Sequence, residues 1–185
     1  MEAFEALIAM LLENDGYWVK INYKVNLTKE EKRKIGRPSS PRWDIDIIAY
    51  KGESNELRLV ECKSYLDSAG VRYSAFDRSD SRRAERYKLF NDSTLRRVVT
   101  HRVVSQLVAT GSCRRSPKVV LCLAAGKIKS EEDHTRLRKH FSRRHWLLLD
   151  QNWIIERLRA VSQSGYQNEV AAIVAKLLER ASKAA

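Results

Sequence analysis

The sequence predicts an α/β fold, in which a central mixed sheet contains an antiparallel meander and is flanked by helices. Amphipathic helical patterns lie near both ends of the chain. Between them, three strand-like runs follow one another before two more alternate with helices. The chain has 185 residues, which matches one domain because a typical domain has roughly 150. We therefore expect residues 1–185 to form a single domain.

The first elements expected are a helix and three strands. Apolar residues recur at steps of three and four from Phe4 to Leu12, and Asn14-Asp15-Gly16 should end this amphipathic helix. The segment Lys51–Asn55 contains Gly and Asn and predicts a turn between two strands. Runs rich in β-branched and aromatic residues predict the three strands of the meander, at Tyr17–Val25, Trp43–Tyr50 and Leu57–Ser64.

Two polar segments interrupt this pattern. Lys29–Arg42 contains one Gly, two Pro and two Ser among its basic residues, so we expect a basic loop. Asp67–Asp92 is polar and only weakly periodic, which predicts a long excursion with a short helix around Arg82–Leu89. Ser93-Thr94 then offers an N-cap for an amphipathic helix that should end near Gly111.

The remaining part of the chain alternates between the two periodicities. Helices at both ends of a central sheet complete the expected architecture. The predicted elements are strands at Lys118–Ala125 and Trp146–Leu149 and helices at Glu131–Arg143, Ile154–Val161 and Asn168–Ala181.

The charge of the chain indicates an anionic partner. Its 35 Lys and Arg outnumber its 23 Asp and Glu, so the formal net charge is +12. Lys29–Arg42 holds six basic and two acidic residues, and Arg72–Arg102 holds nine and four. Such clusters favour a polyanion, with nucleic acid ahead of an acidic membrane because no basic stretch carries a lipid-facing apolar stripe. The residues expected to bind nucleic acid are Lys32, Arg33, Lys34, Arg37, Arg42, Arg72, Arg78, Arg82 and Arg83.

Several classes of protein are disfavoured. No apolar run, Val119–Ala125 included, is longer than seven residues, whereas a transmembrane helix needs roughly 20. The chain starts Met-Glu-Ala-Phe-Glu, with two acids where a secretory signal is basic, so we expect a cytoplasmic protein. Cys62, Cys113 and Cys122 have no Cys-x-x-Cys spacing and predict neither a disulfide framework nor a four-cysteine zinc site. The three histidines His134, His140 and His145 lie six and five residues apart and do not share a helical face, so they predict no zinc site.

The predicted meander carries acids within apolar strands. Because side chains alternate along a strand, Asp44 and Asp46 should share one face while Ile45, Ile47 and Ala49 share the other.

Glu61 and Lys63 should likewise share a face of the next strand. If the turn closes a hairpin, Asp46 faces Glu61 across the ladder. Two neighbouring carboxylates repel each other unless a cation neutralises them, and Mg²⁺ prefers such oxygen ligands. Lys63 would then point toward the same place, where it could orient a water or neutralise charge on a phosphoryl oxygen.

These residues resemble the motif of the PD-(D/E)xK nuclease superfamily, also called the restriction-endonuclease-like fold. The match consists of Asp46, fourteen intervening residues and Glu61-Cys62-Lys63, with each half in an apolar strand. The resemblance implies a divalent-metal phosphodiesterase site, with Asp46 and Glu61 as metal ligands and Lys63 beside the attacking water. Many members add an acid from the first helix. Glu5 matches that position, and Glu2 fits it less well.

Departures from the motif leave alternatives open. No proline directly precedes Asp46; Pro41 lies five residues earlier. Asp44 could be a second ligand, a substitute for Asp46 or a partner of Arg42. Asp46 ranks first because the apolar residues 47–49 follow it. Glu61 and Lys63 could also form a simple surface ion pair, and Glu5 could merely favour a helix N-terminus.

The sequence therefore predicts a Mg²⁺-dependent nuclease, with Mn²⁺ as a substitute, that hydrolyses phosphodiester bonds of DNA by attack of a metal-activated water. RNA is a further possible substrate. The alternative is a non-catalytic DNA- or RNA-binding module, or a subunit of a larger defence or repair assembly, because fold does not fix function. Cutting both strands of a duplex calls for two active sites, so we expect a homodimer.

Overall fold

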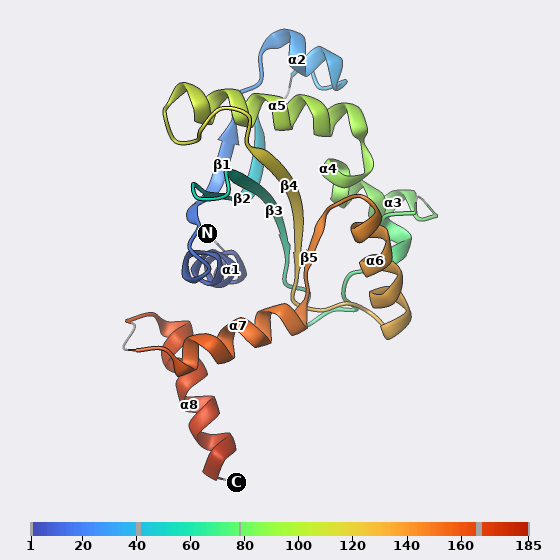
Figure 1. Cartoon of the computed structure of the whole chain (residues 1–185). Coiled ribbons are helices and arrows are strands. Elements are labelled where there is room, and N and C mark those ends of the chain that lie inside the picture. The colour runs from blue at the N-terminus through green and yellow to red at the C-terminus, as the bar shows by residue number, and fades with distance from the viewer. Residues whose placement is uncertain (1, 40–41, 78, 166–167, 185) are drawn as a thin grey trace.

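The computed structural model describes residues 2–39, 42–77, 79–165 and 168–184. A five-stranded sheet with the order β1-β2-β3-β4-β5 forms its centre (Figure 1). The first three strands pair antiparallel, whereas β4 and β5 are added in parallel. The predicted α/β class, with a mixed sheet and an antiparallel meander, is confirmed. The strands are β1 (Trp18–Val25), β2 (Trp43–Lys51), β3 (Glu56–Lys63), β4 (Lys118–Ala125) and β5 (Leu147–Leu149).

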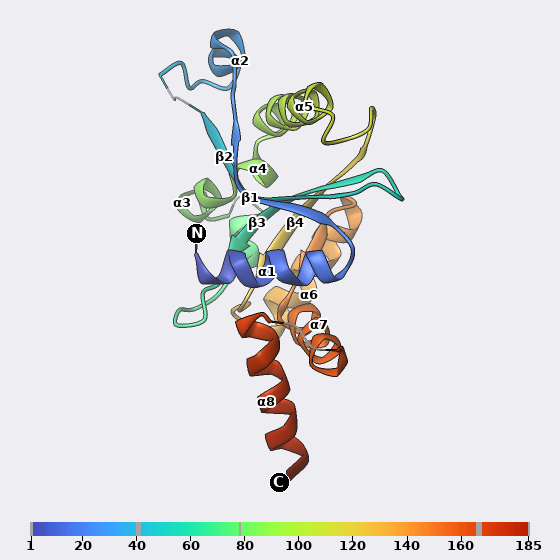
Figure 2. The same ribbon diagram turned by 90° about the vertical axis from the view of Figure 1, so that its left-hand side faces the viewer.

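Helices cover both faces of the sheet. The apolar side chains of α1 and α7 pack in one cluster, and those of α4, α5 and α6 pack in the other. Figures 1 and 2 both show α8 extending away from the sheet. The helices are α1 (Ala3–Asn14), α2 (Lys29–Lys34), α3 (Ser81–Ala84), α4 (Lys88–Asn91), α5 (Ser93–Ala109), α6 (Glu131–Arg143), α7 (Gln151–Gln163) and α8 (Val170–Ala184), with 3₁₀ turns η1 (Tyr73–Ala75) and η2 (Glu85–Tyr87).

The sequence predicted a basic loop after β1. This segment instead contains the helix α2, so the prediction is wrong for its first part. Thr28 caps this helix: its side chain accepts a hydrogen bond from the backbone N–H of Glu31 at 3.2 Å. The Glu31 carboxylate accepts one from the N–H of Thr28 at 2.8 Å. This reciprocal capping box stabilises a short helix in spite of the Gly and Pro residues that follow.

The excursion after β3 also differs from the prediction. One short helix was expected around Arg82–Leu89, but the chain forms η1, α3, η2 and α4 in succession. The N-cap of α5 is Asp92, not Ser93 or Thr94, because its Oδ1 accepts from the Leu95 N–H at 2.9 Å. In each case a side chain that caps a helix or packs in the core sets the boundary.

The last elements follow the prediction with shifted ends. The N-cap Asp150 starts α7 three residues earlier than expected, because its Oδ1 accepts from the Trp153 N–H at 2.9 Å. Across the described ranges, no helix is long and apolar enough to cross a bilayer. The three cysteines are free thiols.

Candidate active site

The predicted acids come from three elements that meet at one end of the sheet. Glu5 lies in the first turn of α1, Asp46 near the start of β2, and Glu61 and Lys63 at the end of β3. Since β3, β4 and β5 are parallel, their carboxyl ends also meet at this edge, where α/β proteins usually bind ligands.

Asp46 lies level with Glu61, as the hairpin predicted. The paired residues of β2 and β3 end with Ile47 opposite Val60, and the same register places Asp46 opposite Glu61. Beyond the last backbone pair, the Asp46 side chain joins the two strands. Its Oδ2 accepts a hydrogen bond from the backbone N–H of Cys62 at 2.7 Å. This bond fixes one carboxylate oxygen to the backbone between Glu61 and Lys63.

The predicted alternation of side chains along β2 is wrong around Asp46. Ile45 packs in the cluster under α5, whereas Ile47 and Ala49 pack in the cluster under α1. Asn22, which the register of β1 and β2 places opposite Asp46, has a positive φ of 52° at the same point. Asn tolerates this left-handed conformation better than most residues. Asp46 therefore lies where the strand changes the face on which its apolar side chains pack.

Glu61 and Lys63 form a close ion pair. Lys63 Nζ lies 2.6 Å from Glu61 Oε1, and each side chain is about one-fifth exposed. Burial raises the pKa of Glu61; Lys63 opposes this shift, and the carboxylates of Asp46 and Glu5 add to it. Burial alone would lower the pKa of Lys63, but Glu61 and Asp46 hold it above its ordinary value. Lys63 therefore keeps its proton at neutral pH.

Glu5 belongs both to a helix cap and to the acid group. Its Oε2 accepts a long hydrogen bond, 3.4 Å, from the backbone N–H of Glu2 in a capping box. Its side chain is buried. Burial raises the pKa of Glu5, and the nearby Asp46 carboxylate raises it further. Glu5, Asp46 and Glu61 thus lie close enough to repel one another.

Asp44 lies apart from this group. Its side chain is 60% exposed, and its Oδ1 lies 3.5 Å from Arg42 Nε. Among the three roles left open by the sequence, this geometry favours the pairing with Arg42.

The carboxylates fit a divalent cation by their chemistry. Asp46 uses Oδ2 and Glu61 uses Oε1 in the contacts above, and their second oxygens make none of the hydrogen bonds or ion pairs found among the described residues. Carboxylate oxygens that repel each other are suitable ligands for Mg²⁺. In the described ranges, no three His, Cys, Asp or Glu side chains are already gathered closely enough to hold a metal ion.

Gly126 fixes the end of β3 from the neighbouring strand. Its backbone N–H donates to the Lys63 carbonyl at 3.0 Å. A Cβ atom at this position would lie 2.5 Å from the Ser64 carbonyl oxygen, closer than real Cβ contacts. This role of Gly126 was not predicted from the sequence. The signal available was a glycine directly after a fully apolar strand.

The predicted nucleic-acid-binding residues fall into two groups. The first lies on or beside α2, where Lys34 pairs with Glu30 at 2.8 Å and the Arg37 guanidinium stacks 5.0 Å from the Trp43 ring centre. The second lies beyond β3, where a pocket described below contains two of the predicted arginines. Arg78 lies outside the described residues. The first group is Lys32, Arg33, Lys34, Arg37 and Arg42, and the second is Arg72, Arg82 and Arg83.

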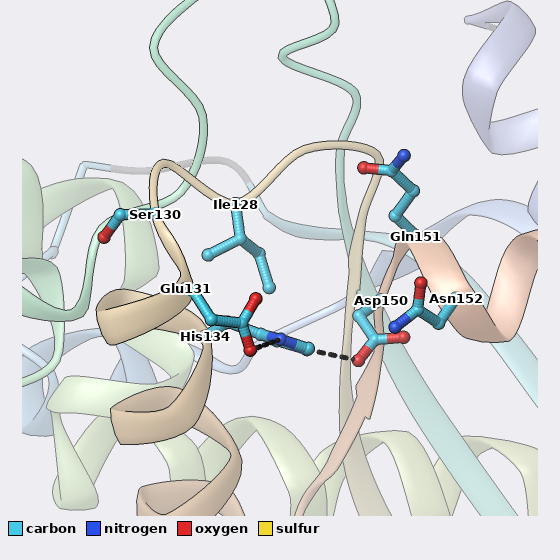
Figure 3. Close-up of a pocket in the computed structure, with 7 residues that line it drawn as sticks. All are labelled: Ile128, Ser130, Glu131, His134, Asp150, Gln151 and Asn152. Atoms are coloured by element: carbon cyan, nitrogen blue, oxygen red, sulfur yellow. Dashed lines mark hydrogen bonds and ion pairs between the residues drawn. The ribbon is translucent and has the colours of Figure 1, made fainter.

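A different pocket lies at the carboxyl ends of β4 and β5 (Figure 3). His134 points between Glu131 and Asp150 there, and its Nε2 lies 2.7 Å from Asp150 Oδ2. The same carboxylate oxygen accepts from Arg138 at 3.0 Å, and its partner oxygen caps α7 through Trp153. Asp150 is therefore fully engaged in joining α6 to α7, and we assign this cluster a structural role. The prediction of no histidine zinc site stays a prediction.

A scan against protein-family models, a search of curated proteins and a search of solved structures each found no match.

Proposed function

We propose that this chain is a metal-dependent nuclease of the PD-(D/E)xK type that hydrolyses phosphodiester bonds, with DNA as the first candidate substrate and RNA as the second. The observation that carries the proposal is the meeting of Asp46, Glu61 and Lys63 at one end of the β2–β3 hairpin. An exposed ion pair alone would explain Glu61 and Lys63, but it would not explain a second and third carboxylate beside them.

Each residue has a distinct part in the proposed reaction. Asp46 and Glu61 would hold Mg²⁺ or Mn²⁺, with Glu5 as a third acid. The bound ion would supply Lewis-acid polarisation of the phosphoryl oxygens and activation of water. Lys63 keeps its proton at neutral pH, so it serves as a hydrogen-bond donor that orients the water or stabilises charge on a phosphoryl oxygen. The basic groups near α2 and beyond β3 would hold the phosphate backbone.

The first test is cleavage of plasmid and linear DNA by the full chain with Mg²⁺, with Mn²⁺ and with EDTA. We expect cleavage only with a metal. Asp46→Asn and Glu61→Gln should each lower the rate at least about a hundredfold, because each removes a group that acts in the transition state. Circular dichroism should show a fold like that of the parent.

Asp44→Asn is the matched control, since it makes the same chemical change two residues away on the same strand. We expect it to retain activity within about tenfold, or about 1.4 kcal/mol of barrier. Metal-independent cleavage, or full activity of both Asp46→Asn and Glu61→Gln, would remove the proposed site. Tight DNA binding without cleavage would identify the alternative, a non-catalytic binding module. Sedimentation of the chain with and without DNA would test the expected homodimer.

A further inference from the structure

A small basic pocket lies directly beyond the end of β3. It has a volume of about 190 Å³ and is formed by the segment after Lys63 together with α3 and η2. Neither aspartate nor glutamate lines it. The residues that matter here are three arginines and two tyrosines: Arg72, Arg83, Arg86, Tyr65 and Tyr87.

The arginines of the lining offer hydrogen-bond donors, and only one of them is paired with an acidic side chain among the described residues. Arg83 forms an ion pair with Asp80, outside the pocket lining. Arg72 and Arg86 make no ion pair with any acid in the part of the chain that the structure describes. Arg86 Nη1 instead lies 3.4 Å from the Tyr65 hydroxyl. Guanidinium groups gathered around one space are the usual means of holding a phosphate group.

The two tyrosines connect this pocket to the candidate active site. Tyr65 follows Lys63 by two residues, and both Tyr65 and Tyr87 line the pocket. A group in the pocket would therefore lie close to the end of β3, the strand that carries Glu61 and Lys63.

Backbone contacts hold one wall of the pocket in place. Gly70 has a φ of 84°, and a Cβ atom there would lie 2.9 Å from the backbone nitrogen of Lys129. Val71 forms a parallel bridge with Ile128, and its N–H donates to the Lys127 carbonyl at 2.9 Å. These contacts hold the segment after β3 against the loop after β4.

The size and charge of the pocket restrict what it can bind. Sites for drug-sized ligands usually measure about 300–1,000 Å³, so this pocket suits a phosphate group better than a whole nucleotide. An internal phosphodiester carries one charge and needs room for the strand to enter and leave. A terminal phosphate monoester carries a charge of about −1.5 to −2 at pH 7 and needs only one opening. Arg72 and Arg86, which form no ion pair with an acid among the described residues, together with the Asp80-paired Arg83, match the terminal group better.

We propose that this pocket binds the terminal phosphate of a nucleic-acid strand and so places a phosphodiester near that end beside Asp46, Glu61 and Lys63. The proposal rests on the proposed nuclease function for the identity of the strand. It adds that the preferred substrate is a strand with a phosphorylated end.

The test measures binding in EDTA, where cleavage plays no part. Short single-stranded DNA with an internal fluorophore is prepared with a 5′-phosphate, with a 3′-phosphate or with neither, and affinities are compared by anisotropy. We expect at least about tenfold tighter binding of one phosphorylated form, or about 1.4 kcal/mol. Arg72→Gln and Arg86→Gln should remove most of this preference.

Arg82→Gln is the matched control, because Arg82 is exposed on α3 but does not line the pocket. It should weaken binding of all three strands alike and leave the preference unchanged. Equal binding of all three strands by the parent would overturn the proposal. A preference for the phosphorylated strand that survives in Arg72→Gln and Arg86→Gln would also overturn it. A loss of affinity in these variants that is the same for all three strands would indicate a contact with an internal phosphate and would overturn it too. A clear preference in a protein that never cleaves with Mg²⁺ would support the pocket and reject the nuclease.

Discussion

Substitution of Gly126 by alanine tests how closely the candidate site depends on the packing of its backbone. The added Cβ would lie 2.5 Å from the Ser64 carbonyl oxygen and 3.2 Å from Phe4 Cε2. To reach even 3.0 Å from that oxygen, the two backbones must separate by roughly half an ångström. The displaced segment follows Lys63 directly, and the Lys63 carbonyl is itself bonded to Gly126.

The expected magnitudes follow from this displacement. Inserting a methyl group into a well-packed site costs about 1–3 kcal/mol in the free energy of unfolding. A misplacement of about 1 Å in a catalytic group can cost about a hundredfold in rate, so half that distance should cost about tenfold. We therefore expect Gly126→Ala to be measurably less stable and to cleave about tenfold more slowly at saturating DNA.

Gly52→Ala provides the matched control. A Cβ atom at Gly52, in the turn between β2 and β3, would meet only Tyr50 Cε1 at 4.0 Å. Urea unfolding and single-turnover cleavage of both variants separate the two effects. If Gly126→Ala unfolds at the same urea concentration as Gly52→Ala and cuts at the parental rate, the close packing of Gly126 does not position Lys63.

Three further predictions follow. Lys63→Ala should bind DNA about as well as the parent but fail to cut it, because its role lies in the transition state; cleavage at the parental rate would reject that role. Replacing Arg33, Lys34 and Arg37 together should lower the slope of log affinity against log salt by about one per residue, while turnover at saturation stays within about tenfold; an unchanged slope would exclude this segment as a phosphate contact. Asp150→Asn should lower the free energy of unfolding at pH 7 by about 1.5–3 kcal/mol. Burial opposes ionisation of Asp150, but His134 and Arg138 hold its pKa below the ordinary value, so its stabilising effect is present above about pH 4 and is lost as the pH falls through the depressed pKa. The variant should therefore show a flatter acid limb in urea unfolding, and a limb like that of the parent would contradict the assignment.

The strands and the hairpin were predictable because they depend on local patterns. Runs of β-branched and aromatic residues mark β1 to β3, and the short turn between β2 and β3 sets their register. That register alone places Asp46 opposite Glu61. The pairing of the two central acids was therefore available from residues 43–63 without knowledge of the rest of the fold.

The segment between β3 and α5 was not predictable for a physical reason. Helices of three or four residues are too short to show a period of 3.6. They are held instead by distant residues: Phe76 packs against Phe90, and both rings contact Phe141 of α6. The pocket beyond β3 depends on this packing. The sequence therefore indicated Arg72 and Arg83 as basic residues for an anionic partner, but it could not show that Arg86 lines the same pocket.

At Asp46, β2 changes the face on which its apolar side chains pack. A prediction that assumes regular alternation along a strand could not find this change, which has a direct consequence for the site. A regular strand would keep Ile45, Ile47 and Ala49 on one face, but Ile45 packs on the opposite side from the other two. The positive φ of Asn22 in the neighbouring strand accompanies this change. An Asn within a run of β-branched and aromatic residues was the available signal. Sites where local rules fail are commonly strained or functional. Here the failure occurs at Asp46, a residue that contacts the β3 backbone through its carboxylate, lies level with Glu61 and lies close enough to Glu5 to raise the pKa of Glu5. A regular sheet would serve stability better, so the irregularity itself supports a role for Asp46 beyond the fold.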